Sequence, residues 1–153
     1  MAESSWSAVA TAAVTVIDAA TTCDVFDGPP TSGDQLFDYV AVGSNPADSL
    51  EPTAGQFAQQ YRGLGPGASR SEQGDIRCFI SSWSGDSDLP ALRIRVLDIF
   101  DDISAAIRDN PTLGLSGVRA PEVEIRAGSI MQGYTNQGAR VDLPFILSYT
   151  SQV

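Results

Sequence analysis

The sequence contains no histidine, and its nine cationic residues are all arginine. Without histidine, the chain lacks the commonest general acid–base group of enzymes and the commonest protein ligand of metals. It also has no phosphate-binding P-loop and no strand-turn-helix serine motif of the kind that activates a nucleophile. We therefore expect neither an enzymatic activity nor a cofactor.

Cysteine is scarce, and the two residues, Cys23 and Cys78, do not have the short spacing of a metal site. The N-terminal residues include neither a basic leader nor an apolar run, so we expect no signal peptide. Both thiols are accordingly predicted to be reduced core residues of a cytosolic protein. Because no run of about 18 apolar residues occurs, we also expect no membrane-spanning segment.

Charged residues are sparse, and acids outnumber bases. Charged residues make up 18% of the chain, against about 25% in an average protein, and the formal net charge is −10. Such a balance repels phosphates, which argues against a protein that reads a DNA groove. The same charge balance is compatible with a protein that lets nucleic acid pass without binding it. The remaining surface, rich in Ser, Thr, Gly, Gln and Ala, suits either an assembled subunit or an ordinary polar protein.

The length of 153 residues fits a single domain with a substantial core. Apolar residues at helical spacing predict a first helix that is capped by Ser4 or Ser5 and ends near Ala20. The apolar face of this helix consists mostly of small residues, which suits close packing on a sheet. Trp6, at the free end, either joins that core or anchors a neighbouring subunit.

Two strands are expected next, a short edge strand at 23–27 and a strand at 37–43 that is buried on both sides. The following segment, 44–73, shows no convincing element apart from a possible helical turn at 54–61. A segment of that length in a compact domain is usually functional or disordered. We interpret it as a long flexible arm that either becomes ordered against a partner or stays disordered.

The stretch 74–108 predicts a strand, a turn and an amphipathic helix. Ile76, Cys78 and Ile80 alternate with a second face on which Phe79 and Trp83 suit a contact between subunits. The helix runs from Leu89 to about Arg108, with Pro90 in its first turn. Its apolar stripe consists of Leu92, Val96, Ile99, Phe100, Ile103 and Ile107.

The other side of this helix is charged. It pairs Arg95 with Asp98 and carries Asp101 and Asp102. Three neighbouring carboxylates either form a solvated or interface surface or bind a hard cation such as Mg²⁺. No glycine-bearing calcium loop accompanies them, so we expect no metal site.

Two long alternating runs predict a closing antiparallel hairpin, with a turn from Tyr134 to Gly138. Pro144 places its strand at an edge of the sheet or at a bulge, because proline cannot donate a ladder hydrogen bond. Glu122, Glu124 and Asp142 alternate with core residues and so face away from the core.

The predicted order is helix, strand, strand, long loop, strand, helix, strand, strand. It indicates a single α+β domain over 1–153, with a mainly antiparallel sheet of four to five strands and both helices on one face.

This order resembles that of the tail terminator proteins of long-tailed bacteriophages. The similarity rests on an Ala- and Val-rich first helix, a short strand that breaks at Gly-Pro and an aromatic strand. It continues through ISSWSGDSDLPALRIRVLDIFDDI, where a strand ends in Trp before a long helix, and through ARVDLPFILSYTS, the last strand.

The resemblance implies a homohexameric ring at the junction of tail and neck in the virion, assembled in the host cytoplasm. The ring would cap the tail tube protein, stop its polymerisation and offer a docking face to the head–tail connector, while DNA passes through the lumen. Glu122, Glu124 and Asp142 would line that lumen, and Trp6, Phe79 and Trp83 would join subunits. The expected contacts with tube and connector are Arg62, Leu64, Arg70, Tyr134 and Asn136.

Other functions stay open. The chain could be another head–tail connector, a tail-completion protein or a tube-like subunit, and closed rings would distinguish the terminator from a protein that forms open tubes. A non-viral cytosolic binding domain is the alternative outside phage structure, and a strict monomer would favour it.

Overall fold

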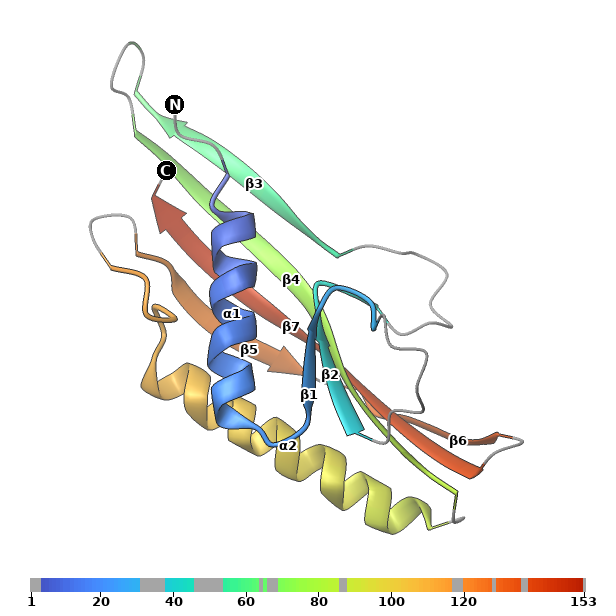
Figure 1. The fold of residues 1–153 in the computed structure, drawn as a ribbon. Coiled ribbons are helices and arrows are strands. Elements are labelled where there is room, and N and C mark those ends of the chain that lie inside the picture. Colours follow the sequence, from blue (N-terminus) through green and yellow to red (C-terminus); the bar gives the residue numbers. More distant parts are fainter. Residues whose placement is uncertain are drawn as a thin grey trace.

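The computed structural model is a two-layer α+β fold in which two helices cover one face of a seven-stranded sheet (Figure 1). It describes residues 4–30, 38–45, 54–63, 65, 69–85, 88–116, 120–127, 129–135 and 138–152. The elements are α1 (Trp6–Ala20), β1 (Asp24–Asp27), β2 (Asp38–Val42), β3 (Gly55–Arg62), β4 (Ser69–Ser84), α2 (Leu89–Asp109), β5 (Glu122–Ala127), β6 (Met131–Thr135) and β7 (Gly138–Gln152). The predicted class, α+β, is confirmed.

Two long antiparallel strands, β4 and β7, form the centre of the sheet and run its whole length (Figure 1). Their register extends from Ser71 opposite Gln152 to Ser84 opposite Ala139. The outer edge of β4 is shared by β3 and β2, and the outer edge of β7 by β5 and β6. The sheet is mixed because β1, beyond β2, runs parallel to it. The central pair therefore aligns all the other strands.

The seven strands exceed the prediction of four to five for two reasons, and the first is β3. Residues 55–62 and 69–73 are strand, so the expectation of an elementless segment there, with a helical turn at 54–61, was wrong. The sequence of β3, GQFAQQYR, has no apolar face to bury, and Phe57 and Tyr61 are 52% and 70% exposed. Main-chain pairing with β4 makes it a strand, and hydrophobic periodicity cannot reveal such pairing.

The predicted closing hairpin is present, but its first strand is divided into β5 and β6. Both pair with β7, and their registers skip 128–130 opposite Leu143 and Pro144. The expectation that Pro144 marks an edge strand was wrong, since β7 lies between β4 and β5. The alternative, an irregularity in the ladder, is what the structure contains, at the residue that has no N–H to donate.

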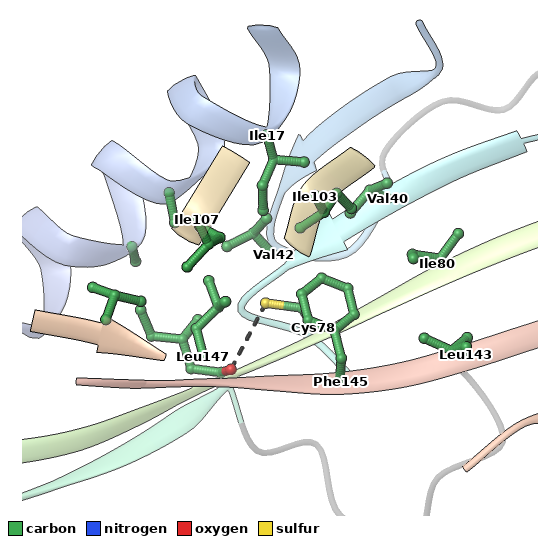
Figure 2. Close-up of a cluster of buried hydrophobic side chains, with 14 of the residues drawn as sticks. Ile17, Val40, Val42, Cys78, Ile80, Ile103, Ile107, Leu143, Phe145 and Leu147 are labelled. Atoms are coloured by element: carbon green, nitrogen blue, oxygen red, sulfur yellow. Dashed lines mark hydrogen bonds between the residues drawn. The ribbon is translucent and has the colours of Figure 1, made fainter. Parts of the chain in front are cut away.

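The core lies between the helices and the sheet (Figure 2). Ile17 on α1 and Ile103 and Ile107 on α2 pack toward Cys78 and Phe145, from the two central strands (Figure 2). All six residues of the predicted α2 stripe belong to this cluster or pack against it. The predicted face of Ile76, Cys78 and Ile80 is therefore confirmed.

The two cysteines are both free. Burial raises the pKa of the Cys78 thiol to about 12, which makes it unreactive at neutral pH, and its sulfur contacts the carbonyl oxygen of Ile76 at 3.7 Å (Figure 2). Cys23 is only half-buried.

The helix α2 begins as expected, with the Asp88 side chain accepting a hydrogen bond from the Ala91 amide at 3.2 Å. Its charged side differs from the prediction. Arg95 forms an ion pair with Asp38 on β2 and not with Asp98 of its own helix. Asp38 also accepts a hydrogen bond from Ser82 on β4. The pair thus joins helix and sheet, a tertiary contact that helical spacing alone cannot indicate.

A buried carboxylate, Glu72 on β4, joins the start of α1 to the sheet. Its side chain is 0% exposed. It accepts hydrogen bonds from the Ser4 and Ser5 hydroxyls (3.1 and 2.7 Å), the Ser5 amide (3.0 Å), the Tyr149 hydroxyl (2.6 Å) and the Gln59 side-chain amide (2.6 Å). These donors come from α1, β3 and β7. One carboxylate therefore fixes three elements, and it lies at the positive end of the helix dipole.

Opposing effects act on the pKa of Glu72. Burial alone would raise it, but the hydrogen bonds from Tyr149, Gln59, Ser5 and Ser4 outweigh burial, so the pKa lies below its ordinary value of 4.5. The pKa of Tyr149 is raised above its ordinary value, mainly by burial and next by the hydrogen bond to Glu72. The tyrosine is therefore a permanent donor and the glutamate a permanent acceptor at neutral pH.

The position of Tyr149 depends on Gly74, its direct partner across the ladder. A methyl group built on Gly74 would lie 2.5 Å from the tyrosine ring, closer than van der Waals contact allows. The glycine leaves space for the tyrosine ring beside β4, and the hydroxyl of that ring reaches Glu72.

We predict that Tyr149→Phe lowers the free energy of unfolding by about 1.5–3 kcal/mol, because it removes a donor from a buried carboxylate. Chemical denaturation at pH 7 measures the change. Tyr134→Phe is the matched control, since that ring is 67% exposed, and it should leave stability within about 0.5 kcal/mol. Equal effects of the two substitutions would contradict the role of Glu72.

We further predict that Glu72→Gln changes how stability depends on pH. A folded-state pKa below the unfolded value stabilises the protein above the unfolded pKa, and this contribution is lost as the pH falls through the folded pKa. The stability difference between wild type and Glu72→Gln should therefore be largest near pH 7 and shrink below about pH 4.5. Denaturation curves between pH 3 and 7 test this, with Glu124→Gln as the control for a lost surface charge. A difference that stays constant over this range would refute the prediction.

Candidate functional site on the open face of the sheet

The sheet face that points away from the helices is polar along half its length. We call it the open face. Residues alternate across a strand, so the partners of the core residues on β4, β7 and β5 must lie there. Its polar half consists of Gln56, Gln73, Asp75, Arg77, Glu122, Glu124, Arg126, Ser148 and Thr150.

A hollow of about 500 Å³ crosses four strands on this face. Its acidic groups are Asp75, Glu122 and Glu124, from β4 and β5. The Asp75 carboxylate accepts a hydrogen bond from the Ser148 hydroxyl at 2.9 Å, and Glu122 and Glu124 are exposed. Arg126 also lines the hollow, so three acids and one arginine make it an open trough of net negative charge, which disfavours anions. The prediction that Glu122 and Glu124 face away from the core is confirmed.

Asp142 differs from these two acids. It lies on the same face, opposite Ser81, but is only 6% exposed. The Arg140 guanidinium donates to its carboxylate at 3.1 Å. The expectation of an exposed lumen-lining acid was wrong for this residue, because a neighbour two positions away on the same strand face neutralises it.

Phe79 was predicted to contact a neighbouring subunit, yet it is 2% exposed. Its ring packs edge-to-face on Tyr39, with centroids 5.7 Å apart, and Tyr39 packs on Phe26 in the same way at 6.0 Å. Strands β1 and β2 thus supply the aromatic partners that we assigned to a second subunit. The prediction that Phe79 forms a contact between subunits was therefore wrong.

The two tryptophans lie in different settings. Trp6 donates its indole N–H to the carbonyl oxygen of Asp75 at 2.9 Å and packs partly buried against the core. It lies against Gly55, where a methyl group would approach the indole nitrogen to 2.8 Å. Of the two alternatives for Trp6, the structure thus contains the core contact. Trp83 is half-buried, opposite Arg140 at the far end of β4.

The residues predicted to meet tube and connector lie at opposite ends of the sheet. At one end, Arg62 closes β3, and Arg70 donates to Gln59 at 3.0 Å while its guanidinium lies 5.5 Å from the centre of the Tyr61 ring. At the other end, Tyr134 on β6 is 67% exposed. Given the rise per residue of a β-strand, the length of β4 places these two ends roughly 45 Å apart. Leu64 and Asn136 lie outside the described residues.

Several residues of the open face were missed from the sequence. Gln56 and Gln73 fall in the segment treated as an arm, and Asp75 lies on the polar side of the predicted strand. On the other side of the sheet, the exposed aromatics Phe57 and Tyr61 were not singled out either. Residues 56–60 read QFAQQ, a stretch without an alternating pattern that could have revealed them.

No cluster of three His, Cys, Asp or Glu side chains suited to a metal ion occurs among the described residues. Asp98, Asp101 and Asp102 are exposed on α2. Within the same described part of the chain, neither helix is long and apolar enough to cross a membrane.

No protein-family model matches the chain, and no curated protein shows significant similarity to it.

Proposed function

We propose that the chain is a ring-forming tail terminator of a long-tailed bacteriophage, which caps the tail tube and accepts the head–tail connector. The observation that carries the proposal is the length of the β4–β7 pair, which extends hairpin ends in opposite directions (Figure 1). A terminator must contact a different partner on each side. A subunit with an exposed tyrosine near each end of the sheet, Tyr61 and Tyr134, at ends roughly 45 Å apart, meets that need in one domain.

The open face supports the proposal from its charge. The acids Glu122, Glu124 and Asp75 line one broad hollow on a face that no helix covers. Turned toward a lumen, this face would repel DNA phosphates and let the duplex pass without binding.

A contact between subunits is proposed at β3 in place of Phe79. In the described part of the chain, β3 pairs with β4 alone, so its other edge presents unpaired main-chain groups. Phe57 and Tyr61 lie exposed on the same strand, on the side of the helices. Aromatic side chains beside a free edge are typical of interfaces. Six copies would complete the ring that the resemblance implies.

The alternative within phage structure is a connector, tail-completion or tube-like subunit, which would use the same two tips. A small-molecule binding domain is favoured by one observation, a hollow whose size falls within the range of ligand pockets. Purified protein that stays strictly monomeric, both alone and with tube subunits, would favour this second function.

We predict that purified protein added to polymerising tube subunits from the same genome shortens the tubes and appears as a ring at one end. Electron microscopy of tube length and tube ends measures both. Tubes of unchanged length, with no ring at either end, would contradict the proposal.

A variant of this experiment addresses the β3–β4 tip. Replacing 63–68 by Asn-Gly keeps Arg62 opposite Ser69 and so preserves the ladder of both strands. Because the tip is proposed to contact a partner, the variant should stay folded but should no longer cap tubes. Arg93→Met, a substitution at an exposed position on α2, is the control and should cap normally. Normal capping by the shortened variant would exclude this tip from the contact.

The lumen assignment makes a separate prediction. Glu122→Lys with Glu124→Lys should leave rings intact and slow DNA release from assembled particles, because the reversed charges attract phosphates. The control, Asp98→Lys with Asp101→Lys, makes the same charge change on the exposed side of α2 and should release DNA at the wild-type rate. DNA release can be followed with an intercalating dye. Equal rates in both variants would contradict the inward orientation of the open face.

A further inference from the structure

Two arginines lie in one row across the open face. Arg77 on β4 and Arg126 on β5 are both in register with Ile146 on β7, which lies between them. Two strand spacings separate their Cα atoms by about 10 Å, a gap that two guanidinium side chains can close above Ile146. Both line a second hollow of about 340 Å³.

Neither arginine has a carboxylate partner. Among the described residues the ion pairs are Arg95 with Asp38 and Arg140 with Asp142, and no side-chain hydrogen bond involves Arg77 or Arg126. Arg77 is half-buried and Arg126 is exposed, in a chain with more than twice as many acids as bases. Two like charges that share one hollow repel each other, and an anion held between them would remove that cost.

The main chain holds Arg77 in place. Its amide donates to the Ala54 carbonyl at 2.9 Å, and its carbonyl accepts from the amides of Gly43 and Ser44 at 2.7 and 2.9 Å. This is the point on β4 at which β2 ends and β3 begins. A cation on such a fixed backbone needs little ordering when it binds a ligand.

The rest of the hollow is mainly apolar, with Met131, Pro144 and Ile146 among its lining residues, and Asn45 and Ser129 add polar groups. The break between β5 and β6 opposite Pro144 opens the sheet edge at this point. Its volume lies within the range of small-molecule pockets. Paired guanidiniums recognise carboxylates and phosphates, and the apolar side chains add contact area for a carbon group.

From this arrangement we propose that Arg77 and Arg126 form a binding site for a small organic oxyanion, a carboxylate or phosphate that carries an apolar group. The site does not depend on the terminator function. It is tested on the free chain in solution, without tube or DNA.

The experiment is isothermal titration at fixed ionic strength with phenyl phosphate and benzoate, and with benzyl alcohol as the neutral analogue. Wild-type protein should bind at least one of the two anions saturably, at one per chain, and should not bind the alcohol. Arg77→Met and Arg126→Met should each lower the affinity about tenfold, because each removes a charge-assisted hydrogen bond and keeps an apolar stem. Arg93→Met removes the same charge from an exposed position on α2 and should stay within twofold of wild type.

Absence of saturable binding to either anion overturns the proposal, as does equal loss in all three variants. Should a methionine variant fail to fold, Arg77→Lys and Arg126→Lys serve as the test. They keep the charge without the planar fork and should weaken binding severalfold. Mass measurement of the unliganded protein tests the other possible source of the anion, which is a second copy of the chain. A dimer that Arg126→Met dissociates would assign the site to a carboxylate of a second copy and would overturn binding of a free anion.

Discussion

The ladder between β4 and β7 is the constraint on which the other elements depend. Every other strand except β1 pairs directly with one of these two, and both helices pack on them. Because the ladder is longer than either helix can cover, its ends extend beyond the core. The same hydrogen bonds that build the sheet thus also project the β3–β4 and β6–β7 ends, where residues are exposed for lack of a covering layer.

A buried charge is the second constraint, and it acts at one end of that ladder. Glu72 has no cationic partner among the described residues, and five donors satisfy it instead. Removing a single donor leaves an unsatisfied carboxylate in the interior, which costs more than the bond itself contributes. This cost ties the first turn of α1 to β3, a strand that has almost no hydrophobic packing to hold it in place.

The sequence predicted the elements that bury an apolar face. Both helices and the inner faces of β4 and β7 have a period that matches their burial, whereas β1 and β2 were predicted from their composition and from the Gly-Pro break after β1. It failed at β3, where Phe57 and Tyr61 stay exposed, because main-chain pairing leaves no period in the side chains. At the site it placed Glu122 and Glu124 correctly by alternation. It misplaced Phe79 and Asp142, since their partners Tyr39 and Arg140 could be assigned only once the strand order and packing were known.

The charges of the open face are fixed by the core on the other side. Val123 and Ile125 pack with the core, so a one-residue slip of β5 along β7 would turn them outward and bury Glu122, Glu124 and Arg126. Burying three unpaired charges is far more costly than leaving two apolar residues exposed. The register that completes the core therefore also sets Arg126 level with Arg77, in the row next to Asp75 and Glu124, and Arg126 lines both hollows. For that reason, substitutions on the open face can change its charge without changing the fold.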